Sequence, residues 1–227
     1  MTEHRQDSES IKESAREAVR QGTDIRAQVH DLTLLAIEKH SFDRQGVRTV
    51  LKAVTEGVAH GAEQRSGNLR DALSEALRGL DQALRTSAEA GQTALKQLTT
   101  TGKDFSDTEL KQALAHLRKL EEEFFATVGQ VADAAGERVK PELRALLATT
   151  RRTGTETGKH VASVMNDFAH RASVASLDAT IAGIEVAGEV GSRFAALASG
   201  ILSGLADALR KPPTAESPPG QDPQRPA

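Results

Sequence analysis

The sequence predicts an all-α fold, an elongated up-and-down bundle of long helices with coiled-coil-like packing. Apolar residues recur at steps of three and four, most regularly in a leucine seam at Leu73, Leu77, Leu80 and Leu84. No segment shows the alternating β-branched and aromatic runs of a sheet protein. Trp and Tyr are absent and Phe occurs six times, so the core must be built from Leu, Val, Ile and Ala, which suits closely packed helices.

The first helix is predicted over residues 10–39. Ser10 and Glu13 form a capping box, in which the hydroxyl and the carboxylate bond the free amides at a helix start. Residues 1–9 are polar and are expected to be disordered. The stretch HSFDRQG then interrupts the apolar pattern and predicts a turn before the next helix.

The second helix is predicted over residues 43–99 and carries the leucine seam. If continuous, it spans about 85 Å at the usual helical rise per residue. Between its two apolar blocks the stretch HGAEQRSGN weakens the pattern and predicts a kink. After it, TTTGKDFSDTEL begins with three consecutive Thr and Gly102, which disfavour helix, and Ser106 with Glu109 forms a second capping box.

Two further helices are predicted, over residues 107–150 and 159–210. Pro141 cannot occupy an undistorted helix interior, so a kink or restart is expected near Gly136–Pro141. The Thr- and Gly-rich residues 149–158 form a second break. Either break could reverse the chain, and the second is favoured because it gives rods of comparable length.

One elongated domain, residues 10–210, is therefore predicted, made of three long rods and a shorter N-terminal helix. Residues 211–227, KPPTAESPPGQDPQRPA, contain six of the seven prolines and are expected to be a disordered tail. The polar N-terminus lacks the apolar core of a secretory signal. The expected location is the cytoplasm, with peripheral attachment to granules or a membrane as a further option.

Composition and motifs argue against an enzyme. The net charge is −3 and Cys is absent, so neither a basic field nor thiolate-bound zinc is available. None of the seven His pairs with another at i, i+4. Glu121–Glu123 point in three directions from one helix, which predicts a solvated face. The stretch TGTETGKH resembles part of a phosphate loop but lacks the Ser or Thr after Lys159 and a preceding strand.

No catalytic residue, cofactor or metal ligand is therefore assigned from the sequence. Nucleic-acid binding is not expected either, because the basic residues are scattered and have no aromatic stacking partners.

Small residues recur at every fourth position in the last predicted helix, along a ridge on which another backbone can pack closely. The ridge consists of Ala179, Gly183, Ala187, Gly191 and Ala195. Beside it lie the candidates for contact with a surface or partner, namely Ile181, Ile184, Phe194, Leu197, Ile201, Leu202 and Leu205.

A membrane span does not fit this helix. The longest uncharged run, Phe194–Ala206, has 13 residues, whereas the hydrocarbon core requires about 20. Two interpretations remain open. The helix is either a buried central rod of the bundle, or it displays part of its apolar surface and adsorbs to a hydrophobic boundary.

Three segments are similar to a family of uncharacterised, all-helical proteobacterial proteins: RTVLKAVTEGVAHGAEQRSGNLRDALSEALRGLDQAL, FSDTELKQALAHLRKLEEEF and SVASLDATIAGIEVA. This resemblance spans most of residues 10–210 and implies an all-helical fold, without an activity or a catalytic residue. The Ala-rich helices, the missing Cys and Trp and the Pro-containing tail also resemble phasins in character. Phasins coat polyhydroxyalkanoate granules, so that resemblance implies adsorption to a lipid or polyester surface.

The functional expectation is a non-enzymatic, phasin-like amphipathic protein. It associates with a lipid or polyester granule surface, self-associates as a homo-oligomer, or does both. The alternative is a cytosolic helical-bundle scaffold with no lipid role.

Overall fold

The computed structural model describes residues 2–40, 44–100 and 107–171, and within them the side chains of residues 6–40, 44–93 and 114–167. This part of the chain contains seven α-helices and no strand, which confirms the all-α prediction. The helices are α1 (Thr2–Gln21), α2 (Ile25–Lys39), α3 (Arg44–Gln64), α4 (Leu69–Thr100), α5 (Asp107–Ala134), α6 (Lys140–Thr153) and α7 (Glu156–Arg171).

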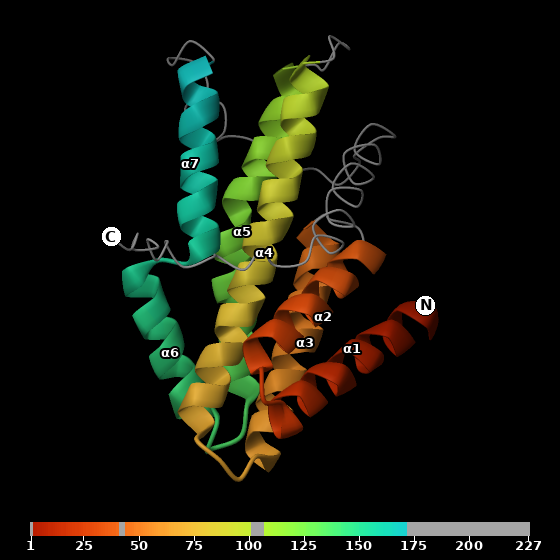
Figure 1. Cartoon of the computed structure of the whole chain (residues 1–227), viewed down its shortest axis with the longest axis vertical. Helices are drawn as coiled ribbons and strands as arrows, with labels where there is room; N and C mark the ends of the chain where they lie inside the picture. The colour runs from red at the N-terminus through yellow and green to blue at the C-terminus, as the bar shows by residue number, and fades with distance from the viewer. Residues whose placement is uncertain (1, 41–43, 101–106, 172–227) are drawn as a thin grey trace, which may run out of the picture.

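The helices form three antiparallel pairs that lie side by side (Figure 1). The first pair is α1 with α2, and the second is α3 with α4. In the third, α5 pairs with α6 and α7, which follow one another in the same direction. Equivalent helices of neighbouring pairs run parallel. Lys12 of α1 pairs with Glu56 of α3 at 3.3 Å, and further along both helices Arg65 donates to the Val19 carbonyl at 2.6 Å. Helices α1 and α3 therefore run parallel. One layer therefore consists of α1, α3 and α5, and the other of α2, α4 and α6–α7. The predicted up-and-down pattern is confirmed.

The predicted long rods were wrong, because most of them are divided into shorter helices. The helix expected over 10–39 is interrupted at residues 22–24, where Asp24 caps α2 by accepting a bond from the Ala27 amide at 3.2 Å. The helix also begins at Thr2, so residues 2–9 are not the disordered segment that was predicted. They contain neither Gly nor Pro, and nothing in them stops a helix from extending past Ser10.

The helix expected over 43–99 reverses completely where only a kink was predicted. Helix α3 ends at Gln64 and α4 begins at Leu69. Asn68 caps α4, since its side-chain oxygen accepts from the Asp71 amide at 3.3 Å. A four-residue turn of Arg, Ser, Gly and Asn is therefore enough to fold the chain back on itself.

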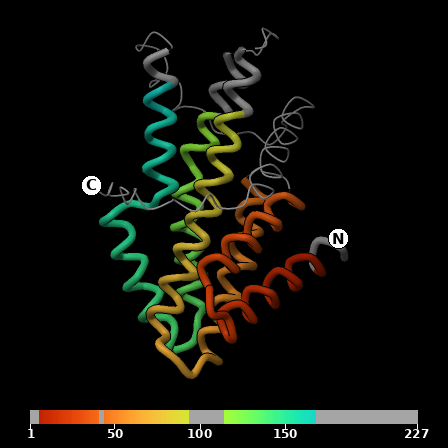
Figure 2. The backbone as a smooth tube through the Cα atoms, in the orientation of Figure 1, coloured from red at the N-terminus to blue at the C-terminus, as the bar shows by residue number. Residues whose placement is uncertain are grey.

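The reversal after α5 lies at residues 135–139, and the favoured reversal at 149–158 was wrong. Asp133 pairs with Arg144 at 2.7 Å, and Arg151 lies 5.3 Å from the Phe125 ring, so α6 returns antiparallel along α5. Pro141 stands in the first turn of α6, where a missing amide hydrogen costs no helical bond. In Figure 2 the backbone turns at the base of the molecule and returns through α6 and α7 in one direction.

The helix predicted over 159–210 begins at Glu156 as α7. Its predicted course after Arg171 lies outside the described residues, as does the Pro-rich segment 211–227.

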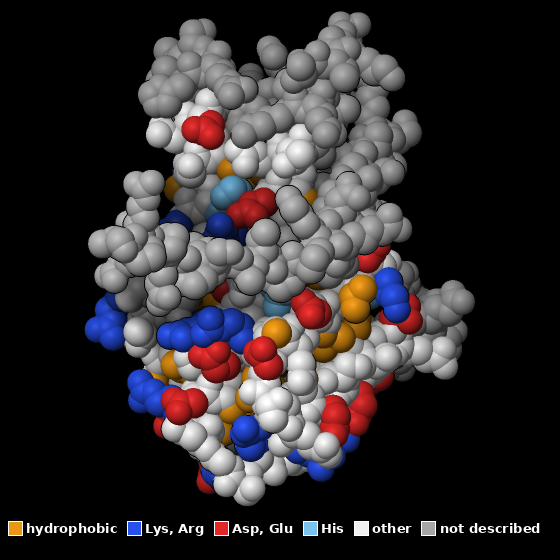
Figure 3. Space-filling view, in the orientation of Figure 1, with side chains coloured by type: hydrophobic (Ala, Val, Ile, Leu, Met, Phe, Trp, Pro, Cys, Tyr) orange, Lys and Arg blue, Asp and Glu red, His pale blue; other side chains and the backbone are white. Residues whose placement is uncertain are grey.

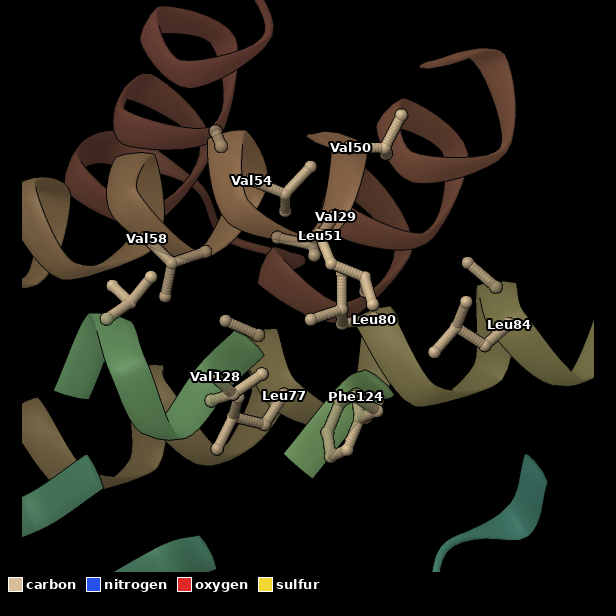
Figure 4. Packing of buried hydrophobic residues seen from close by; sticks show 14 of the residues in the cluster. Val29, Val50, Leu51, Val54, Val58, Leu77, Leu80, Leu84, Phe124 and Val128 are labelled. Atoms are coloured by element: carbon tan, nitrogen blue, oxygen red, sulfur yellow. The ribbon is translucent and has the colours of Figure 1, made fainter. Parts of the chain in front are cut away.

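The core is continuous through both layers. Side chains of α2, α3, α4 and α5 converge in Figure 4, among them Val29, Leu51, Leu80 and Phe124. All four residues of the leucine seam are buried, with exposed fractions between 0% and 7%, so the predicted seam is confirmed as core. Leu35 is the one exposed large hydrophobic side chain in the part of the protein that the structure describes.

Glycines let the first two pairs lie close together. A Cβ atom at Gly57 or Gly61 of α3 would overlap the backbone carbonyl oxygens of Lys12 or Arg16 in α1. A Cβ at Gly79 of α4 would likewise overlap the Arg26 carbonyl oxygen of α2. The helix backbones themselves are therefore in contact at these three positions, which is the small-residue packing that the sequence predicted elsewhere.

Gly57→Ala should destabilise the protein because α1 would have to move off α3. We expect a loss of about 1–3 kcal/mol in the free energy of unfolding, measured by urea denaturation. Gly129→Ala is the matched control, since no atom lies within 4 Å of a Cβ there. It should be neutral or stabilise by up to about 1 kcal/mol. Equal effects of the two substitutions would contradict the close approach of α1 and α3.

Candidate functional site

All twelve residues assigned from the sequence to surface contact or close packing, between Ala179 and Leu205, lie outside the described residues. The structure therefore brings none of them together and tests none of them. Two other features that the sequence analysis singled out are described. They are the stretch resembling a phosphate loop, and the acidic run Glu121–Glu123.

The stretch resembling a phosphate loop forms the junction between α6 and α7, residues 153–158. Gly154 has φ 77° and ψ 159°, a backbone conformation that is accessible almost only to glycine. It ends α6 and turns the chain by one bend into α7. Thr155 then caps α7, because its hydroxyl oxygen accepts from the Gly158 amide at 2.8 Å.

Two carboxylates from other helices bind the start of α7. Asp81 of α4 accepts from the Glu156 amide at 2.8 Å and from the Thr157 amide at 3.1 Å, and the Thr157 hydroxyl lies 2.7 Å from the same carboxylate. Glu121 of α5 accepts from the Thr155 amide at 3.1 Å and from its hydroxyl at 2.6 Å. We call this set of bonds the carboxylate latch. It places negative charge at the positive end of the α7 helix dipole.

The latch explains the glycine and threonine content of the junction. A Cβ at Gly158 would overlap the Glu121 carboxylate, so glycine is what lets that group approach. Thr155 and Thr157 are each only 1% exposed, and their hydroxyls are hydrogen-bonded to the two acids. The amides that would hold a phosphate in a phosphate loop donate to protein carboxylates instead, so this stretch is a structural joint.

A cavity of about 540 Å³ lies beside the junction, between α4 on one side and α6 and α7 on the other. Basic side chains line it, but each is paired. Arg26 binds Glu75 through two bonds of 2.8 and 3.0 Å, Arg85 binds Glu89 at 2.8 Å, and Lys159 binds Glu156 at 2.7 Å. The cavity therefore offers little unsatisfied charge to a ligand. Nor does the described part of the chain contain a group of three or more His, Asp or Glu side chains that could hold a metal ion.

The ion pairs at this cavity have the expected effect on protonation. The hydrogen bonds from Arg26 hold the pKa of Glu75 below its ordinary value of 4.5, although partial burial opposes the shift. The hydrogen bond from Lys159 likewise lowers the pKa of Glu156. Both acids are therefore charged at neutral pH.

The prediction that Glu121–Glu123 form a solvated face was wrong for two of the three residues. Glu121 belongs to the latch. Glu123 is 5% exposed and forms an ion pair with Arg44 of α3. Glu122 alone is exposed. Consecutive helical positions do point in three directions, but two of those directions face neighbouring helices, which a single helix cannot reveal.

These features define a class of protein before any comparison: over the described residues, an all-α, two-layer stack of antiparallel helix pairs in which the start of α7 is held by a polar joint. The chain belongs to a family of unknown function, DUF6781, whose model matches residues 1–211. No curated protein and no solved structure matches the chain. Among the described helices none is long and apolar enough to cross a membrane.

Gly154→Ala should strain the junction without a steric clash, since the nearest atom to a Cβ there is the Lys159 Cε at 3.9 Å. The cost should be about 1–3 kcal/mol of unfolding free energy, as expected for a non-glycine residue in this conformation. Gly67→Ala, in the α3–α4 turn, is the control and should change stability by less than about 0.5 kcal/mol. Thermal and urea unfolding measure both. A Gly154→Ala protein as stable as the Gly67→Ala protein would refute the strain.

Glu75→Gln should make the protein less sensitive to acid. Because the folded pKa of Glu75 is lowered, its pairing with Arg26 stabilises the fold above the ordinary pKa, and this contribution is lost as pH falls through the folded value. The two side chains are 37% and 43% exposed, so the difference between wild type and variant should stay below about 1 kcal/mol. Urea unfolding should show a larger difference at pH 7 than at pH 3. An equal difference at both values would contradict the assignment.

Proposed function

We propose that this protein is a non-enzymatic helical scaffold that attaches peripherally to a hydrophobic surface, a lipid layer or a polyester granule. Attachment occurs through residues 174–209, which we call the C-terminal apolar stretch. The helices before it act as the carrier and do not contact the surface themselves.

The observation that supports this division is where the apolar side chains of the described helices lie. Among the described residues of α1–α7, the large hydrophobic side chains are buried in the common core or partly buried against it, and Leu35 is the exposed exception. The face drawn in Figure 3 mixes charges of both signs, with hydrophobic side chains visible in small patches between them. Such a surface is unsuited to adsorption on lipid or polyester.

The C-terminal apolar stretch has the opposite character in sequence. It contains the 13-residue uncharged run from Phe194 to Ala206, together with Ile181 and Ile184. A run of that length is too short to span a bilayer, so contact with a hydrophobic boundary would be lateral. Lateral adsorption of this weakly charged stretch, for which the sequence predicts a helix, is the mode of attachment that the proposal requires.

Self-association is the second candidate function, and a specific observation favours it. Glycines spaced by four, Gly57 and Gly61, bring two helix backbones into contact in the described part of the chain. The same spacing of small residues runs from Ala179 to Ala195 and would suit a second copy of the chain. Light scattering separates the candidates, because Gly183→Leu with Gly191→Leu would reduce the oligomer mass only under self-association.

Replacing Leu197, Ile201 and Leu205 together by Glu should abolish attachment, because three charges would have to enter the hydrophobic boundary. Full-length protein is floated with phosphatidylcholine vesicles and, separately, with polyhydroxybutyrate particles. Leu35→Glu is the matched control, since it removes the exposed hydrophobic residue of α2, and it should float like wild type. Loss of flotation in the control but not in the triple variant would move the contact to α2 and defeat the proposal.

A further inference from the structure

We propose that α5, α6 and α7 form one cooperative unit, which separates from α1–α4 as a whole while α1–α4 stay folded. The two parts meet between the second and third helix pairs, and we call this place the opening boundary. The inference rests on the described side chains at the boundary and does not depend on the proposed function.

The first and second pairs are joined more tightly than the second and third. Helix backbones touch at Gly57, Gly61 and Gly79, where a Cβ atom would overlap a carbonyl oxygen of α1 or α2. In α5, by contrast, nothing lies within 4 Å of a Cβ at Gly129. Since contacts between closely packed atoms add up to a large attraction, the joint between the first two pairs is the firmer one.

Cavities lie along the opening boundary. Two of them, of about 560 and 530 Å³, are lined by α1 and α3 on one side and by α5 on the other. The cavity of about 540 Å³ beside the α6–α7 junction is lined by α2 and α4 on one side and by α5, α6 and α7 on the other. The two parts therefore pack against each other over only part of the boundary, and each gap forfeits contacts.

Two buried polar groups of α5 also lack partners at this boundary. Thr127 is 1% exposed, and its hydroxyl has no hydrogen-bond partner in the described part of the protein, although it lines the cavity between α3 and α5. Glu123 pairs with Arg44 through one carboxylate oxygen. Its other oxygen is buried without a hydrogen bond, and Arg48 lies 3.8 Å from it. Such groups gain hydrogen bonds when water reaches them, so they favour opening.

Several of the ties across the opening boundary are polar. The Gly136 amide donates to Glu63 at 2.8 Å, and Arg70 lies 3.9 Å from the Glu142 carboxylate. The bonds from Asp81 to the start of α7 also cross it. Water replaces these partners when the two parts separate, so the net cost of breaking each tie is small.

Helices α6 and α7 are tied to α5, which makes the three a single unit. Arg144 of α6 binds Asp133 of α5 at 2.7 Å. At the other end of α6, Glu121 of α5 accepts from the Thr155 amide at 3.1 Å. These bonds lie within the unit and stay intact when it moves, so α6 and α7 leave together with α5.

Separation of the two parts changes the character of the surface. Leu77 of α4 and Phe124 of α5 line the same cavity from opposite sides of the boundary and belong to the common core (Figure 4). Burial of such side chains keeps the closed form dominant. In the closed form Leu35 is the exposed large hydrophobic residue among those described. The open form therefore presents apolar faces that the closed form hides.

Hydrogen exchange on the full-length protein tests the cooperative unit. The slowest amides of α5, α6 and α7 should share one protection factor, because they exchange through the same opening. That factor should be about tenfold or more below the factor for the slowest amides of α3 and α4. Equal protection of α5 and α3, or three different factors within α5–α7, would overturn the inference.

Gly57→Ala distinguishes this opening from unfolding of the whole molecule. The substitution loosens α1 from α3, and both of these helices stay folded in the open form. It should therefore accelerate exchange in α3 by about fivefold or more and leave the slowest amides of α5–α7 unchanged. Acceleration by the same factor in α3 and in α5–α7 would mean that the molecule opens as one body, and the inference would fail.

Thr127→Val provides a test that does not depend on the Gly57→Ala protein. It removes the unpartnered hydroxyl at nearly constant volume, so exchange in α5, α6 and α7 should slow together by about fivefold or more. Thr49→Val is the matched control, because Thr49 lines the same cavity from α3 but its hydroxyl donates to the Gln45 carbonyl at 2.8 Å. It should not slow exchange in α5–α7. Slowing confined to α5, or none at all in Thr127→Val, would count against the unit.

Discussion

With no Trp or Tyr and six Phe in the chain, few side chains are large enough to fill the space between helices at ordinary separation. The structure meets this constraint by bringing backbones into contact at glycine. Gly57 and Gly61 seat α1 on α3, and Gly79 seats α2 on α4. Each contact also fixes axial position, because a single carbonyl group faces the site where a Cβ would stand. The register between the first two helix pairs therefore depends on three glycines.

The third pair is joined differently. Gly129 of α5 has no neighbour within 4 Å of a Cβ position, so no backbone contact forms there. Phe124 and Val128 pack into the core instead, and Glu123 pairs with Arg44 of α3. At the far end of α5, the Gly136 amide donates to Glu63 at 2.8 Å. Attachment thus changes along the chain, from backbone contact through side-chain packing to polar bonds at α7.

This order explains which features could be predicted from the sequence. The leucine seam repeats within one helix, and all four of its leucines are buried as expected. At residues 65–68 the sequence predicts only a kink, because a Gly and an Asn within a long helical pattern indicate a break in the helix but not a reversal of the chain. The reversal at residues 135–139 was placed too late, since Thr-rich residues 149–158 are a stronger helix-breaking pattern than the residues before Pro141.

The carboxylate latch could not be predicted from sequence patterns within a single helix. Asp81 and Glu121 stand in the middle of helices, at positions that resemble ordinary solvent-facing acids. Their partners, Thr155 and Thr157, lie more than 30 residues further along the chain. Only the stacking of the third pair on the second brings these groups together. All of the predicted contact residues, from Ala179 to Leu205, lie outside the described residues, so the sequence remains the evidence for them.

The same acids hold the start of α7 in place. The free amides at the start of a helix require hydrogen-bond acceptors. A carboxylate from another helix can accept from them, and its negative charge also interacts favourably with the positive end of the helix dipole. Thr155 supplies one acceptor from within the junction, whereas the other bonds come from α4 and α5. The first turn of α7 is therefore completed only when α4 and α5 are already side by side. It follows that two carboxylates help to set the position at which α7 begins and the direction in which it leaves the junction.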